Sequence, residues 1–538
     1  MMLSITCGGT RPDAGPPSAG GSAAAAGVAS GGEAGGLSGT GAAAGTSGSV
    51  AGATAAGGGS GFANSGAAGA SPSAGAAGHS GGDPGPDSAG SGGTSAAGGG
   101  SGGMMAGGAA GSAGTAGNTA ARRLRPAPNG RHLQWSDGTP VFLLSDTAWL
   151  LPARYSPAEV AAHVTTRVAQ GFTAIQMTAS FPENGYQSLS SVFTDGDFTT
   201  PVEAYWAALD DKIEQCTDAG LVVILNPFWK KTGDATLDGN GPTKCRAYGK
   251  WLGARYRTNT RVAYFVGGDA TPGSVRDELG AIGLGIQEAY AEAGLPPAII
   301  AYHGAPQRTS REEWPDDPSW LTLDWSYAYS EPLNPALPYQ ENWSDWRRTP
   351  VLPIMFGEGW YDRDNGATNS SRWGNRYMLR RQAWWNPLSG ALAGYAYGAE
   401  PIWFHRYGGS TPAQAALWNS GLDAARMKKF LDTLEWWRLR PDLTAAFITA
   451  GNSAPGTLDH AVGALADDGS FGVVYSPGAR TLTLRMPLGR NYTIRWFDPS
   501  NGTYRSGEIE GAPGESVVMR HPGNNASNAP DWVIHVAE

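Results

Sequence analysis

The chain of 538 residues contains only three cysteines, Cys7, Cys216 and Cys245. We expect Cys216 and Cys245 to be buried free thiols. Acidic residues outnumber basic ones: the chain has 47 Asp and Glu and 38 Lys and Arg, which gives a net charge of −9. A general nucleic-acid binder needs a basic surface, so this class of protein is not expected. No run of about 18 apolar residues occurs, and we therefore expect no membrane-spanning helix.

Several motifs that carry chemistry are also missing. The sequence has no His-Glu-x-x-His motif, no Cys-x-x-Cys pair and no aspartate-rich calcium loop, so we expect neither a metal nor another cofactor. No glycine-rich phosphate loop follows a strand-like run. No Gly-x-Ser-x-Gly nucleophile elbow joins a strand-like run to a helix-like one, which argues against a serine hydrolase.

Residues 1–121 consist almost entirely of glycine, alanine and serine. Phe62 is the one aromatic residue between positions 8 and 121, and five charged residues interrupt that stretch: Arg11, Asp13, Glu33, Asp83 and Asp87. Such a segment has too little apolar side-chain area to offset the entropy cost of ordering it. We therefore predict a disordered low-complexity tether.

The first residues, MMLSITCGGT, are too short for a signal peptide. A short apolar run, one cysteine and a long Gly/Ser tether nevertheless resemble the mature end of a bacterial lipoprotein. Our hypothesis is that translation starts upstream of Met1 and that the lipidated Cys7 tethers the protein to a membrane. The expected location is then extracellular or at the cell surface. An in-frame stop codon directly before Met1 would contradict the hypothesis.

The region after the tether alternates short apolar runs with amphipathic ones. Short apolar runs that alternate with helices indicate βα units and a parallel sheet. Eight such runs over about 300 residues predict a (β/α)8 TIM barrel at residues 122–440. The eight runs span residues 141–146, 172–178, 221–227, 262–269, 298–304, 321–327, 351–358 and 391–398.

Three expected helix starts share one pattern, in which a hydroxyl cap is followed by proline and then by Glu or Gln. They are Ser156 to Glu159, Thr200 to Glu203 and Thr411 to Gln414. This pattern is typical of a capping box with proline at the first helical position. Gly171 and Gly220 suit the ends of the first two helices.

Two carboxylates end apolar runs directly after glycine. Asp269 follows Gly267 and Gly268 at the fourth run, and Glu358 follows Gly357 at the seventh. Glycine there lets the backbone bend and a ligand approach closely. Barrel enzymes keep their chemistry at the carboxyl ends of the strands, and cleavage of a glycosidic bond needs one protonated and one ionised carboxyl group. We predict such a pair, although a capping or salt-bridging role for either acid stays open.

Other polar and aromatic residues follow the same strand ends and are candidates for binding sugar hydroxyls or sugar faces. Structural roles remain open for some of them, such as capping by Asp146, a turn at Asn226 and a purely structural histidine at position 303. The functional role for His303 would be to orient a carboxylate or the substrate. The candidate substrate-binding residues are Asp146, Trp149, Gln176, Asn226, His303, Trp360, Tyr397 and Trp403.

The segments DGTPVFLLSDTAW, VAYFVGGD, AYHG and PVLPIMFGEGWY resemble the apiosidase-like glycoside hydrolase family from about Leu124 to Leu439. The resemblance implies a (β/α)8 barrel that removes the branched pentose apiose from pectic side chains. It also implies that Asp269 and Glu358 are the catalytic acids. The chain departs from the family pattern at Gly304, at residues 325–328 and in the loop after Glu358, which affects the sugar pocket more than the reaction type.

Residues 441–538 contain short strand-like segments separated by turn signals such as Ser-Pro-Gly and His-Pro-Gly. They predict a small all-β sandwich, and they resemble the collagen-binding-like domain that often follows this barrel. A simpler interpretation is a sandwich that packs on the barrel and stiffens it.

The sequence therefore predicts a glycoside hydrolase with a carbohydrate substrate. Glu358 would be the nucleophile and Asp269 the general acid/base, with retention at the anomeric carbon. Two alternatives stay open: a non-catalytic glycan- or matrix-binding surface protein on a barrel scaffold, and a hydrolase of another sugar, such as an arabinofuranosidase or an endo-acting enzyme.

Overall fold

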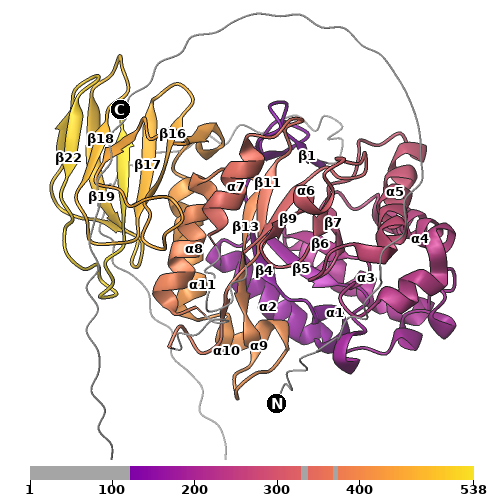
Figure 1. The fold of residues 1–538 in the computed structure, drawn as a ribbon. Coiled ribbons are helices and arrows are strands. Elements are labelled where there is room, and N and C mark those ends of the chain that lie inside the picture. The colour runs from indigo at the N-terminus through magenta and orange to yellow at the C-terminus, as the bar shows by residue number, and fades with distance from the viewer. Residues whose placement is uncertain (1–121, 329–336, 368–373) are drawn as a thin grey trace, which may run out of the picture. The chain divides into compact units, whose positions relative to one another are not determined.

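The computed structural model describes residues 122–328, 337–367 and 374–538 (Figure 1). The expected tether and Cys7 lie outside the described residues. None of the helices in the described ranges combines the length and the apolarity that crossing a lipid bilayer requires.

Eight parallel strands form the barrel, each overlapping one of the eight apolar runs, so the predicted (β/α)8 architecture is confirmed. Neighbouring strands follow the order β8-β7-β6-β5-β4-β13-β11-β10, with the short β9 antiparallel to β10. The bounds are β4 Leu143–Thr147, β5 Ala174–Thr178, β6 Val222–Asn226, β7 Val262–Gly267, β8 Ile300–His303, β9 Arg308–Thr309, β10 Asp324–Tyr327, β11 Ile354–Glu358 and β13 Gly394–Ala399, with β12 Tyr361–Asp362 beside β13.

A serine side chain takes the place of a regular ladder between β8 and β10. The Ser310 hydroxyl donates to the Tyr302 carbonyl at 2.7 Å and accepts from the Trp325 backbone N–H at 2.9 Å. A backbone bond from Thr322 N–H to the Ile300 carbonyl, 2.9 Å, lies beside it. The barrel is therefore nearly closed.

Side chains along the strands alternate between the barrel interior and the surrounding helices. Ile224, Phe265 and Met355 belong to the interior cluster, whereas Val223 and Val266 pack outward in the larger cluster. Because both faces are covered, the strands are apolar almost throughout, as in other all-buried parallel sheets.

Helices connect the strands and surround them in Figure 1. Short 3-10 turns at residues 183–185, 189–191, 194–196, 273–275 and 436–438 complete the connections. The helices are α1 Leu151–Arg154, α2 Pro157–Gln170, α3 Glu203–Asp218, α4 Asp234–Tyr256, α5 Arg276–Glu292, α6 Ser310–Glu313, α7 Pro338–Trp346, α8 Arg376–Leu388, α9 Glu400–Trp403, α10 Pro412–Ala415 and α11 Asn419–Leu431.

Two of the three predicted capping boxes form. Ser156 caps α2 and Thr411 caps α10, each with the reciprocal bond from the third helical residue. The prediction for Thr200 is wrong, because α3 begins only at Glu203 and its first turn has no side-chain cap. Pro201 instead pairs with Phe193 in an isolated bridge, and the Thr200 hydroxyl donates to nearby carbonyls.

The C-terminal region is a sandwich of two antiparallel sheets, as predicted. Val474, Ile494 and Leu484 are among the residues from both sheets that form its core. The larger sheet contains β14 Leu439–Pro441, β16 Val462–Ala466, β17 Phe471–Ser476, β23 Trp532–Ala537, β19 Tyr492–Asp498, β20 Thr503–Tyr504 and β21 Ile509–Gly511; the smaller contains β15 Ile448–Ala450, β18 Leu482–Arg485 and β22 Ser516–Met519. A further small sheet before the barrel contains β1 Leu124–Pro126, β2 Leu133–Trp135 and β3 Pro140–Val141.

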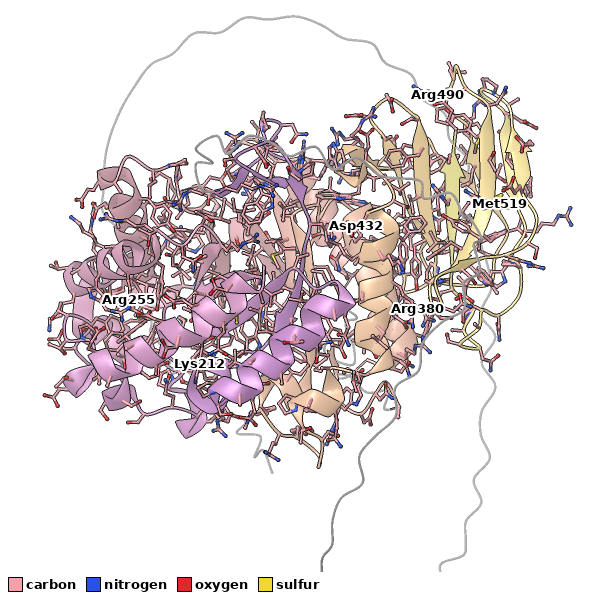
Figure 2. All side chains as sticks on the ribbon, turned by 180° about the vertical axis from the view of Figure 1, so that it is seen from behind. Lys212, Arg255, Arg380, Asp432, Arg490 and Met519 are labelled. Carbon is pink, nitrogen blue, oxygen red and sulfur yellow. The ribbon has the colours of Figure 1, made fainter. Side chains whose placement is uncertain are left out.

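The barrel contacts the sandwich through a fully buried arginine, labelled in Figure 2. Arg380 of α8 donates to both carboxylate oxygens of Asp531, just before β23, at 2.7 and 2.6 Å. It also donates to Asp423 of α11 at 2.9 Å. One guanidinium therefore neutralises carboxylates from both folding units.

Replacing Arg380 by methionine is expected to lower the free energy of unfolding by about 3–5 kcal/mol, because the change leaves the buried carboxylate of Asp531 without its counter-charge. Asp423 keeps its pairs with Arg376 and Arg426. Urea unfolding measures this. The matched control is Arg490→Met in the sandwich, where the arginine is partly exposed and pairs with Glu538; its loss is expected to stay below about 1 kcal/mol. Equal losses in the two variants would contradict the role of Arg380.

A buried acid pair lies on the outer side of the barrel. Asp324 of β10 faces Asp345 of α7 and the guanidinium of Arg311. Burial and then the charge of Asp345 raise the pKa of Asp324 well above its ordinary value. The folded state thus holds a proton that the unfolded state releases above about pH 4, so this carboxyl lowers stability as the pH rises from there.

Asp324→Asn is therefore expected to stabilise the protein at pH 7 by on the order of 1 kcal/mol, and by less near pH 4. Thermal unfolding at both pH values measures the difference. A variant that is less stable than the wild type at pH 7 would show that the ionised carboxylate is favourable in the fold.

Candidate active site

One histidine contacts both predicted catalytic acids. The backbone N–H of Asp269 donates to His303 Nδ1 at 2.8 Å. Nδ1 is then an acceptor, so the proton of the neutral ring is on Nε2, which lies 2.5 Å from Glu358 Oε2. His303 therefore donates to Glu358, which suits an ionised carboxylate. The strand ends of β7, β8 and β11 meet at this ring.

The second oxygen of Glu358 is also held by a donor. The Tyr361 hydroxyl donates to Glu358 Oε1 at 2.7 Å and accepts from Trp149 Nε1 at 2.7 Å. Burial and then the charge of Glu358 raise the pKa of Tyr361 well above its ordinary value, so the phenol stays protonated. With a side chain only 7 % exposed, Glu358 is a buried carboxylate with a donor on each oxygen.

Asp269 has different neighbours. The Tyr327 hydroxyl at the end of β10 donates to Asp269 Oδ1 at 2.8 Å, and Lys231 contacts Oδ2 through its ammonium group. Burial, followed by the charges of Glu358 and Asp269, raises the pKa of Tyr327 well above its ordinary value. The Asp269 side chain is 16 % exposed and the Lys231 side chain 45 %. Asp269 is therefore the more accessible acid.

The glycines beside the two acids serve the protein's own packing. A Cβ on Gly357 would lie 1.7 Å from the Trp325 ring, and one on Gly268 would lie 2.6 Å from the Trp229 ring. The backbone also bends as expected, since Gly267 and Gly268 have φ values of +97° and +136°. The predicted bend is present, and tryptophan rings occupy the space that we expected for a ligand.

Two polar residues inside the barrel brace the strand ends that carry the acids. Gln176 Nε2 donates to the Gly357 carbonyl at 3.0 Å, and Asn226 Nδ2 donates to the Gly267 carbonyl at 3.0 Å. The amide oxygens of both side chains are buried and have no hydrogen-bond partner among the described residues.

Aromatic rings continue from His303 along one side of the site. Trp149 and Trp229 lie with ring centroids 5.5 Å apart, and Phe181 stacks on Trp229 at 4.7 Å. Trp403 lies 5.7 Å from Tyr186, and both are only partly buried. Amphipathic rings of this kind suit contact with sugar faces.

Three other predicted residues are not brought to the two acids. Asp146 accepts from His163 and Arg167 of α2, at 2.8 and 2.7 Å, in a buried ion pair. Tyr397 points outward as well, where its hydroxyl donates to Asp362 at 3.3 Å. Strand residues alternate between the two faces, so a polar residue at a strand end can face the helices.

The third of them, Trp360, is 3 % exposed and has the Arg381 guanidinium 5.8 Å from its ring centroid. The Trp360 backbone N–H donates to Gln382 of α8 at 2.8 Å. Trp360 thus lies near α8 and the sandwich contacts of Arg381.

The site also contains a carboxylate that sequence reasoning missed. Glu183, between β5 and α3, accepts from Trp229 Nε1 at 2.7 Å. Burial raises the pKa of Glu183, the charge of Lys231 opposes this shift, and the charges of Asp269 and Glu358 add to it. The segment FPENGYQ ends no strand, and no signal in it marks Glu183.

No three His, Cys, Asp or Glu side chains converge as metal ligands in the part of the chain that the structure describes. Cys216 and Cys245 are buried free thiols, as expected. Burial raises the pKa of the Cys216 thiol to about 12, so it is not a reactive thiolate.

Solved structures with a similar fold include two glycoside hydrolases. One, described only as a glycoside hydrolase, is 20 % identical over 77 % of this chain and 97 % of its own, with a TM-score of 0.64. Another, a family 5 glycoside hydrolase from Bacteroides vulgatus, is 20 % identical over 77 % of this chain and 94 % of its own, with a TM-score of 0.65. At this identity the likeness shows the fold. No curated protein sequence matches the chain.

The barrel fold and the match to a family of catalytic domains define the class of protein, an enzyme of the glycoside hydrolase type. The family is more specific: the model of the apiosidase-like catalytic domain matches residues 127–438, and the chain belongs to that family. Its substrate is therefore a carbohydrate, and the interpretation as a non-catalytic binding protein is set aside.

Proposed function

We propose that the enzyme removes apiose or a related pentose from pectic side chains by a retaining mechanism, with Glu358 as nucleophile and Asp269 as general acid/base. The observation that carries this proposal is the imidazole of His303, which accepts from the backbone N–H of Asp269 and donates to the Glu358 carboxylate. Glu358 has a donor on each oxygen, as an ionised nucleophile requires, and Asp269 is more exposed, as a group that must reach the leaving oxygen requires.

The reaction then takes two steps. A Glu358 oxygen bonds to the anomeric carbon as the bond to the leaving oxygen breaks, and Asp269 gives its proton to that oxygen. Asp269 next takes a proton from water, whose oxygen bonds to the anomeric carbon and releases Glu358. In a retaining enzyme the two carboxyl groups lie about 5–5.5 Å apart, whereas an inverting enzyme has about 6.5–9.5 Å between them.

The proposal is tested by incubating the enzyme with pectic and hemicellulosic oligosaccharides, including arabinofuranosides, and analysing the products. Release of apiose with retained anomeric configuration supports it. Release of arabinose alone would show that the sugar removed is arabinose and not apiose, and the proposed mechanism would still apply. Absence of any product over the whole panel would overturn the assignment of pectic and hemicellulosic substrates.

We also propose that the enzyme is tethered outside the cell through a lipidated Cys7. Metabolic labelling with radioactive palmitate, in wild type and in Cys7→Ala expressed from the upstream start, tests this. Equal labelling would contradict it. For the sandwich we propose that it packs on the barrel and stiffens it. The alternative role, collagen binding, is tested by measuring binding of the full chain to immobilised collagen.

A further inference from the structure

Lys231 contacts Asp269, and the charges of Asp269 and Glu358 act on Glu183, although neither Glu183 nor Lys231 ends a strand. Trp229, two residues before Lys231 in the same turn after β6, donates to Glu183. Lys231, which neutralises Asp269, and Trp229, which donates to Glu183, therefore belong to one short segment. Lys230, between them, contacts Asp234 at 3.0 Å instead.

This turn is fixed against the end of β7. The Lys230 backbone N–H donates to the Gly267 carbonyl at 3.3 Å, and the Trp229 ring covers Gly268 so closely that no Cβ fits between them. Because Asp269 follows Gly268 directly, the turn that carries Lys231 packs against the strand end that carries Asp269.

The ammonium of Lys231 interacts with more than one carboxylate. Burial lowers its pKa, but the contact with Asp269 and the charges of Glu183 and Glu358 outweigh burial and raise the pKa above its ordinary value. The other groups that face Asp269 are the Tyr327 hydroxyl from β10 and the His303 ring from β8. Lys231 thus contacts Asp269 directly, and Glu183 acts on both groups through its charge.

We propose that Glu183 and Lys231 act together as positioning residues that set when Asp269 holds its proton, an inference that rests on the proposed role of Asp269 as general acid. The Glu183 carboxylate attracts the ammonium and repels negative charge on Asp269, which favours the protonated acid before cleavage. After Asp269 has given up its proton, Lys231 stabilises the carboxylate that then activates water.

The pH dependence of kcat/KM tests the proposal. Glu183→Gln keeps an acceptor for Trp229 Nε1 and removes only the charge, so the alkaline limb is expected to move to lower pH by about one unit. Lys231→Met is expected to move it to higher pH by a similar amount. The controls are Asp195→Asn, an exposed acid in the same β5–α3 connection, and Lys230→Met; both are expected to leave the limb in place. A Glu183→Gln enzyme with lower kcat/KM and an unmoved limb would overturn the proposal.

A second measurement needs no substrate. Competitive acylation of lysines followed by mass spectrometry reports the reactivity of the Lys231 amine. In Glu183→Gln we expect it to rise at least about twofold near pH 9, with Lys230 unchanged, because the pKa of Lys231 falls. If the reactivity of the Lys231 amine is the same in Glu183→Gln as in the wild type, the inference is overturned. A different outcome is an enzyme that cleaves no substrate although the reactivity of Lys231 rises in Glu183→Gln. This result would refute the proposed function but would still support the interaction between Glu183 and Lys231.

Discussion

Glu358→Gln is expected to lower kcat by at least about 10⁴-fold, because the amide cannot form the glycosyl-enzyme bond. The amide oxygen can still accept from His303, and the amide nitrogen can donate to the Tyr361 hydroxyl, so the fold and substrate binding should be preserved. Initial rates on the substrate found in the oligosaccharide panel measure the loss, and calorimetric binding measures the retained affinity.

Tyr361→Phe is the matched control for Glu358. It removes the Tyr361 donor to Glu358 Oε1 and leaves the carboxylate, so kcat is expected to fall by about 10- to 100-fold. A Glu358→Gln enzyme that retains more activity than Tyr361→Phe would contradict the assignment of Glu358 as nucleophile.

Asp269→Ala is expected to have an effect that depends on the leaving group. Without an acid, the rate on substrates with poor leaving groups should fall by about 10²–10⁴-fold. Glycosides with a dinitrophenyl leaving group need no proton, so formation of the glycosyl-enzyme should be nearly unaffected. Steady-state and burst kinetics on both substrate types measure the difference.

Azide distinguishes the base role of Asp269 from general damage. The alanine side chain leaves room for an anion that attacks the glycosyl-enzyme without base catalysis, so azide should restore turnover and yield a glycosyl azide of retained configuration. Equal losses on both leaving groups, with no rescue by azide, would show that Asp269 does not act as the acid/base.

Local sequence patterns were sufficient to predict the barrel. Each apolar run became a parallel strand because both of its faces are covered, by the interior and by the helices. The capping prediction at Thr200 failed because a bridge between Phe193 and Pro201 competes for that segment. A local motif cannot reveal a long-range pairing of this kind.

The site was predictable only in part. The sequence predicted that Asp269, His303 and Glu358 end strands, and the structure joins them by hydrogen bonds. Asp146 has the same local signature, but its side chain faces α2 and pairs with Arg167. The face of a strand-end residue depends on strand register and bulges, such as the irregularity between Ser326 and Tyr327, which composition does not encode.

The central claim is that Glu358 bonds covalently to the sugar while Asp269 handles the proton. Peptide mapping by mass spectrometry of Asp269→Ala, stopped during the burst on an activated glycoside, tests it most directly. We predict one added glycosyl group on the peptide that contains Glu358. An adduct on another carboxylate, or free product of inverted configuration with no adduct, would contradict the account.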